Sequence, residues 1–136
     1  MFVLKKGKSK FIYLPVTPST AITAGTVVTY SAGLLVAATS ATNAVDLLGV
    51  LKHNISITDV DYATSRNVEV EVPLEKNVEY DVDVTSGLVA SDIMKEVDLT
   101  DGNNINRAAS AVKVARCTAV YSTVKGRFLV KFQGAY

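Results

Sequence analysis

Residues 67–84 read NVEVEVPLEKNVEYDVDV, and this stretch decides the fold class. Valine or tyrosine stands at every second position on each side of Pro73, and glutamate or aspartate stands between them. A period of two residues is typical of a strand with one buried and one solvated face. The sequence therefore predicts two strands here, joined by residues 73–77 and paired with each other in antiparallel fashion.

The solvated faces of these two strands carry an acidic face, which consists of Glu69, Glu71, Glu79, Asp81 and Asp83. Antiparallel pairing of the strands would place acids opposite acids, and this costs stability unless cations lie nearby. We therefore expect the acidic face to bind basic groups of a partner protein. Calcium is the alternative ligand, but the acids lack the loop spacing of a dedicated calcium site. No metal ligands are predicted.

Short strands and turns continue on both sides of this stretch. The sequence predicts a hairpin from residues 26–30 and 34–37, a buried strand at 47–51, one helical turn at 91–96, a loop at 100–104 and a closing hairpin over 111–132 with its turn at 125–126. Such spacing is typical of an all-β fold. We expect a small antiparallel β-barrel or sandwich with at most one short helix.

The N-terminal segment differs from the rest of the chain. Residues 1–19 are expected to form an extended basic arm, and residues 20–136 a single β domain. The arm residues expected to contact a partner are Lys5, Lys6, Lys8, Lys10, Phe11 and Tyr13. Residues 11–45 carry no charge. This composition suits either extended chain lying on another protein or short strands with small side chains.

The formal net charge of +1 conceals a strong segregation of charge along the chain. All thirteen acids lie between residues 46 and 101, and the flanking segments are basic. This asymmetry favours electrostatic attraction between copies and hence a homo-oligomer, unless folding mixes the charges into an ordinary surface. No apolar run approaches the roughly 20 residues of a membrane-spanning helix, so no membrane partner is expected.

The residue types that carry most enzyme chemistry are scarce. His53 is the only histidine, and it follows a predicted strand where a surface hydrogen bond is expected of it. Cys117 is the only cysteine, and it is expected to pack as a small apolar side chain. The sequence predicts no catalytic residue, no cofactor and no enzymatic activity. Nucleic-acid binding is not expected either, because the acidic middle third would repel phosphates.

Three short stretches succeed one another as Ala24-Gly25-Thr26-Val27-Val28, Gly33-Leu34-Leu35-Val36-Ala37-Ala38 and Leu48-Gly49-Val50-Leu51. This succession resembles the head decoration, or capsid cement, proteins of tailed bacteriophages. The resemblance covers residues 20–55, and the rest of the chain follows the family only in outline. It implies a non-enzymatic virion protein, made in the host cytoplasm, that binds the major capsid protein on the capsid exterior, with a trimer as the favoured oligomer.

Other functions remain open at this stage. A phage tail or connector protein could use the same kind of β domain. A small trimeric β enzyme of the nucleotide-hydrolysing type lacks a supporting motif. A carbohydrate-binding β module would favour exposed tryptophan, and the chain contains none.

Overall fold

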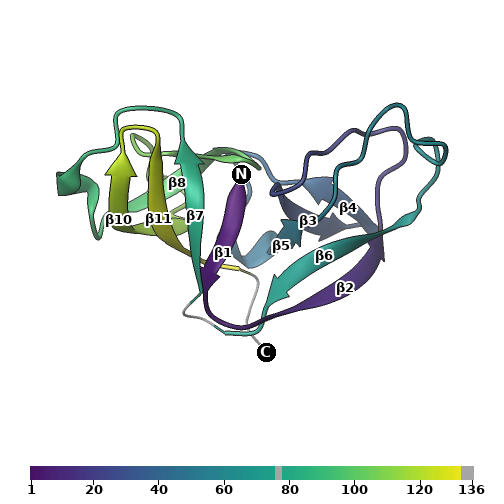
Figure 1. Ribbon diagram of the computed structural model, residues 1–136, viewed down its shortest axis with the longest axis horizontal. Helices are drawn as coiled ribbons and strands as arrows, with labels where there is room; N and C mark the ends of the chain where they lie inside the picture. Colours follow the sequence, from purple (N-terminus) through teal and green to yellow (C-terminus); the bar gives the residue numbers. More distant parts are fainter. Residues whose placement is uncertain (76–77, 133–136) are drawn as a thin grey trace.

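The computed structural model describes residues 1–75 and 78–132, and it is almost entirely β (Figure 1). The all-β prediction is therefore confirmed. The strands are β1 (Phe2–Lys6), β2 (Ser9–Pro15), β3 (Val27–Ser31), β4 (Leu34–Ala37), β5 (Leu47–Leu51), β6 (Asn67–Pro73), β7 (Glu79–Val84), β8 (Glu96–Asp101), β9 (Asn104–Asn106), β10 (Ala115–Ser122) and β11 (Lys125–Val130). Two short 3₁₀ helices, η1 (Ala44–Asp46) and η2 (Ala90–Asp92), interrupt the described strands.

The strands form two sheets that lie side by side (Figure 1). One sheet has the order β1-β7-β11-β10-β8-β9, and a parallel pairing of β7 with β9 closes the last five of these strands into a barrel. The second sheet has the order β2-β6-β5-β3-β4. It curls until Val16, just after β2, forms a bridge with Leu35 of β4. The expectation of a small β-barrel or sandwich is confirmed.

A long antiparallel ribbon ties the two sheets together. Strand β1 pairs with β7 in one sheet, and β2 pairs with β6 in the other. Gly7 lies between β1 and β2 with a φ of +110°, a backbone conformation that only glycine adopts without strain. A Cβ atom at Gly7 would also lie 3.1 Å from Val78, so the chain crosses from sheet to sheet where a side chain would not fit.

The predicted pairing of the two alternating strands is wrong. The burial pattern of β7 does alternate as expected, and Val70 and Val72 of β6 are buried. However, β6 and β7 belong to different sheets, and each pairs with part of the N-terminal segment instead of with the other. Alternation identified the buried face of β7, whereas in β6 the predicted solvated residue Glu71 is buried as well. Alternation also carries no information on which strand is the neighbour.

Residues 2–15 are extended, as expected of the N-terminal segment, but they do not form an arm apart from the β domain. These residues form two strands of the sheets, and Phe2 is buried with only 3% of its surface exposed. Its main-chain N–H donates to the carbonyl oxygen of Gly25 at 2.8 Å. The lysines suggested solvation, but in β1 Phe2 is buried and Leu4 is half-buried although Lys5 and Lys6 follow directly.

Most of the remaining local predictions are confirmed. Strands β3 and β4 form the predicted hairpin, β5 is the predicted buried strand, and β10 and β11 form the closing hairpin. The turn of that last hairpin lies at residues 123–124, two residues before the predicted position. The helical turn is η2, which follows Val89 instead of Ser91. The uncharged run from residue 11 to residue 45 forms short strands.

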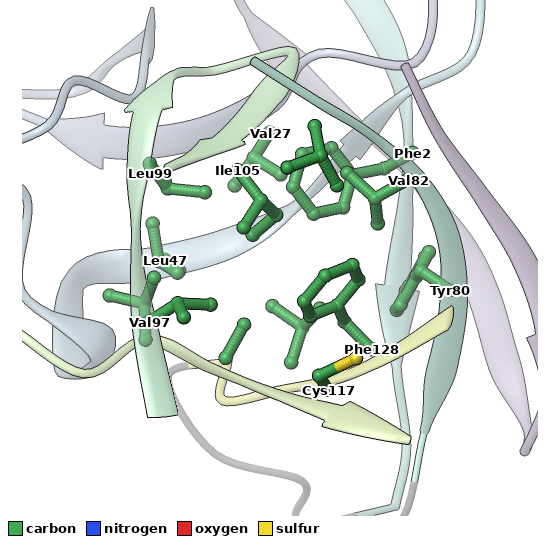
Figure 2. Close-up of a cluster of buried hydrophobic side chains, with 14 of the residues drawn as sticks. Phe2, Val27, Leu47, Tyr80, Val82, Val97, Leu99, Ile105, Cys117 and Phe128 are labelled. Carbon is green, nitrogen blue, oxygen red and sulfur yellow. The ribbon is translucent and has the colours of Figure 1, made fainter. Parts of the chain in front are cut away.

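The larger core takes side chains from both sheets, as Figure 2 shows. Tyr80 and Phe128 are fully buried in the barrel, and Phe2 packs edge-on against Tyr80 with a centroid distance of 6.1 Å. Val27 of β3 and Leu47 of β5 reach into the same cluster from the second sheet. A smaller core fills the second sheet around Val28, Leu35 and Val70. The two sheets are therefore joined by side-chain packing as well as by the chain that passes between them.

The alternation along β1 predicts unequal effects for two neighbouring substitutions. Phe2→Ala should lower the free energy of unfolding by about 3–5 kcal/mol, because it removes a buried ring from the larger core. Val3→Ala, at a half-exposed position of the same strand, should cost about 0.5 kcal/mol. Urea denaturation measures both values. Equal losses would contradict the packing of β1 into the barrel.

Alanine substitutions at two glycines, Gly49 of β5 and Gly33, should differ in their effect on stability. A Cβ atom at Gly49 would lie 2.4 Å from the carbonyl oxygen of Glu71, so Gly49→Ala should cost about 3 kcal/mol through overpacking against backbone. Gly33→Ala is the control: its φ is +82°, but no atom lies within 4 Å, so only backbone strain of about 1 kcal/mol is expected. Similar melting temperatures for the two variants would show that β5 and β6 can separate.

Candidate protein-binding surface

Strand β2 presents two aromatic side chains to solvent. Its inward residues, Ile12 and Leu14, pack against the smaller core, so the alternate residues Phe11 and Tyr13 point outward. Phe11 is 51% exposed and Tyr13 is 63% exposed. Tyrosine and phenylalanine are enriched at protein interfaces, because a rigid ring buries much apolar area at a small entropic cost. This face of β2 is therefore suited to bind another protein.

Neighbouring groups hold these rings in place. The Tyr13 hydroxyl donates to Oε2 of Glu69 at 2.5 Å, and this hydrogen bond raises the pKa of Tyr13. Nε2 of His53 lies 3.5 Å from the other oxygen of Glu69. The ammonium of Lys52 lies 5.6 Å from the centroid of the Phe11 ring. We call these five residues, Phe11, Tyr13, Lys52, His53 and Glu69, the aromatic surface.

A hollow of about 240 Å³ lies beside Tyr13. Its lining includes the polar side chains of Asn54, Arg66 and Asn67, together with His53 and Glu69 of the aromatic surface. The side chain of Asn54 accepts a hydrogen bond from the main-chain N–H of Ala24 at 2.7 Å, which fixes the wall of the hollow.

The loop between β5 and β6, at the right of Figure 1, exposes further apolar side chains. Ile57 is 74% exposed and Val60 is fully exposed. Arg66 braces this loop through ion pairs with Asp59, at 2.7 Å, and with Asp61. The hydrogen bond from the main-chain N–H of Ser56, and then that from Arg66, lower the pKa of Asp59. The ion pairs of Arg66 therefore brace the loop in which Ile57 and Val60 are exposed to solvent.

Phe11, Tyr13 and Glu69 were predicted as contact residues, and the structure brings these three together. Lys52, His53 and Arg66 beside them were not predicted. The contact between Tyr13 and Glu69 spans 56 positions of sequence and depends on the pairing of β2 with β6. The signal that was available was the position of Lys52 and His53 directly after a predicted strand.

The acidic face is divided between the sheets. Glu69 and Glu71 lie on β6, and Glu79, Asp81 and Asp83 lie on β7. The residues opposite the acids are therefore not other acids: Glu71 faces Phe11 and Val50. The electrostatic cost that motivated a basic partner is absent, and that reasoning was wrong.

Each of these acids also has a partner within the chain. Ser9 donates its hydroxyl to the buried Glu71 at 3.3 Å, and Thr118 donates to Glu79 at 2.7 Å. Arg127 donates to Asp81 at 2.9 Å, which lowers the pKa of that carboxyl against the effect of burial. The amino group of Met1 lies 3.1 Å from Asp83.

The arm lysines are spread along the ribbon. Lys5 and Lys6 belong to β1, Lys8 lies at the crossing between the sheets, and Lys10 belongs to β2. Nζ of Lys6 lies 3.8 Å from Glu79. The main-chain groups of Lys8 bind the segment after β6, since its N–H donates to Glu75 and its carbonyl accepts from Leu74. These lysines do not converge on one surface.

The sequence also singled out the only histidine, His53, and the only cysteine, Cys117. His53 lies on the surface beside Glu69, and Cys117 is buried in β10, where burial raises the pKa of its thiol. Within residues 1–75 and 78–132, no three histidine, cysteine or acidic side chains gather as metal ligands would. The same residues contain no helix of the length and apolarity needed to cross a membrane.

Comparison with known proteins adds no relative. No protein-family model matches the chain, and no curated protein has a matching sequence.

Two carboxylates at the far side of the barrel, around β8, were missed by the sequence analysis. Asp92 is buried, and it accepts hydrogen bonds from Nε and Nη2 of Arg107 at 2.8 and 2.9 Å. Glu96 accepts from Arg116 and from Lys131, each at 2.9 Å. The hydrogen bond from Arg116 is the main cause that lowers the pKa of Glu96 to about 2. These ion pairs join η2 to the segment after β9, and they join β8 to β10 and to the residue that follows β11.

Acid should therefore weaken the fold in a defined range of pH. A carboxyl whose pKa is lower in the folded state stabilises the fold above its unfolded pKa and loses this effect as the pH falls through its folded pKa. For Glu96 this range runs from about 4.5 down to about 2. The urea midpoint of the wild type should fall across this range, and Glu96→Gln should fall less. Parallel curves for the two proteins would contradict the role of Glu96.

Proposed function

We propose that this chain is a non-enzymatic structural protein of a virus particle. It binds the outer surface of the capsid and holds neighbouring copies of the major capsid protein together. The protein acts on the capsid exterior after synthesis in the host cytoplasm, and a homotrimer is the favoured form. The same contacts would serve a tail or connector protein of a phage.

The observation that carries this proposal is the pair of exposed aromatic side chains on β2. Phe11 and Tyr13 stand on a strand that is fixed in the ribbon, so they lose little freedom when a partner covers them. A cement protein binds its partner through many weak contacts at once. Side chains that lose little freedom on binding therefore contribute most to its affinity. The resemblance of residues 20–55 to capsid cement proteins supports the same function.

The braced loop supports it further. Ile57 and Val60 add apolar area on a second rigid element, and Arg66, which holds that loop, also lines the hollow beside Tyr13. An interface usually combines an apolar centre with a polar rim. Lys52, His53 and Glu69 beside the two rings supply such a rim.

Particle binding tests the proposal directly. The double variant Phe11→Ser, Tyr13→Ser should keep the melting temperature of the wild type, since both rings are largely exposed, and should bind capsids about 100-fold more weakly, as expected for the loss of two aromatic anchors. Cosedimentation with purified capsids measures occupancy.

The control is Tyr30→Ser, which removes a ring that is 45% exposed on β3. It should leave occupancy unchanged. Wild-type occupancy by the double variant would contradict the assignment of this surface.

A carbohydrate-binding module is the second candidate. The 240 Å³ hollow favours it, because polar side chains surround it and the ring of Tyr13 forms one side. Sugars bind in this way, with an apolar face on an aromatic ring and hydroxyls on amides, carboxylates and arginine. Glycan-array binding that Tyr13→Ser abolishes, together with no binding to capsids, would favour this candidate over the first.

A further inference from the structure

A basic hollow lies on the six-stranded sheet, away from the aromatic surface. It has a volume of about 370 Å³ and lies between the start of β8, the segment after β9 and the start of β10. Four cationic side chains line it, namely Lys95, Arg107, Lys113 and Arg116. Residues 108–110, which are small, leave the hollow open.

Fixed ion pairs orient the two guanidinium groups. Arg107 uses two of its five N–H donors on the buried Asp92, and Arg116 uses one on Glu96. The described carboxylates therefore position these arginines without using all of their donors. A guanidinium held in this way can bind a further carboxylate with little additional loss of freedom.

The backbone at Lys113 is fixed by hydrogen bonds instead of ion pairs. Its φ is +60°, a left-handed conformation that is strained for a lysine. The buried carboxylate of Asp98 accepts the main-chain N–H groups of Ala111, Val112 and Lys113 at 2.8, 2.9 and 2.6 Å. These three hydrogen bonds fix the turn. A strained residue that the surrounding structure holds in place is a feature of binding sites.

The charges around the hollow leave a positive excess. Lys131 is a fifth cation, since it shares Glu96 with Arg116. The carboxylates of this region are Asp92, Glu96 and Asp98, and the last of these is buried against main-chain N–H groups. Among the described ion pairs of this region, none engages Lys113.

We propose that the basic hollow binds an acidic segment of another protein, through carboxylate side chains that contact Lys113 and Arg116. The inference does not depend on the proposed function, because it concerns binding by the chain itself. Charge complementarity favours an anionic partner, and the lining favours a short acidic peptide over a single-stranded nucleic acid. The hollow has no aromatic side chain in its lining for a base to stack on.

Titration of the full chain with a hexaglutamate peptide tests this inference. In isothermal titration at about 0.05 M salt the peptide should bind, and at about 0.5 M salt the affinity should fall, because the shorter Debye length screens the charge pairs. In nuclear magnetic resonance spectra, the shifted amide signals should belong to residues 107–116. Absence of binding at low salt, or shifts elsewhere on the molecule, would overturn the inference.

Three variants make the test specific. Lys113→Gln and Arg116→Gln should each weaken peptide binding by about tenfold, as expected for the loss of one close charge pair. Lys125→Gln, which removes an exposed lysine from the opposite end of the β10–β11 hairpin, should leave the affinity unchanged. Equal effects of all three variants would mean that only net charge matters, and the hollow would not be a site.

Lys113→Gly separates binding from folding. Glycine adopts the left-handed conformation without strain, so this variant should melt no lower than the wild type while it loses about tenfold in affinity. A variant that unfolds more readily but binds as before would show that Lys113 serves structure alone. A single-stranded oligonucleotide that binds the wild type more tightly than the peptide would replace the acidic protein partner with a nucleic acid.

Discussion

The antiparallel ribbon in which β1 pairs with β7 and β2 pairs with β6 is the constraint on which the rest of the structure depends. Among the described residues, it is the one pairing of segments that runs through both sheets. Contacts this distant in sequence close long loops, and the entropy that they cost must be offset by burial. Phe2 and Tyr80 supply burial on one side of the crossing, and Ile12 and Val70 on the other.

The ribbon also determines what the surface can do. Because β2 is held on one edge by β6, its outward residues have fixed positions, and Phe11 and Tyr13 become a rigid surface in place of a loose tail. The same crossing brings Glu69 opposite Tyr13. An N-terminal segment that ordered only on its partner would lose conformational entropy at that moment, and binding would be weaker for the same contacts.

Sequence predicted local structure well and pairing poorly. The alternation in residues 67–84 identified the buried face of β7 and the buried valines of β6, though not the burial of Glu71, and the hairpin of β3 and β4 was located correctly. Nothing in that alternation distinguishes a neighbour close in the chain from the N-terminal strands. In β2 the pattern is hidden, because Phe11 and Tyr13 on the outer face are as apolar as Ile12 and Leu14 on the inner face.

The basic hollow was invisible to sequence for a related reason. A turn in the left-handed conformation is usually marked by glycine or asparagine, and here a lysine adopts it. The buried Asp98 that makes this possible lies 15 positions earlier, in a strand. Local propensity cannot show a conformation that a distant side chain imposes.

Folding changes the meaning of the charge segregation along the chain. The acids of residues 46–101 meet bases from the two flanking segments: Lys6 lies by Glu79, Arg127 by Asp81, and both Arg116 and Lys131 by Glu96. The complementarity of the charge blocks is thus largely used within the chain. These acids already bind cations and hydroxyl groups of the same chain, so the charges left to contact a partner are mainly positive. Identical copies would therefore have to associate through contacts other than pairs of acidic and basic side chains.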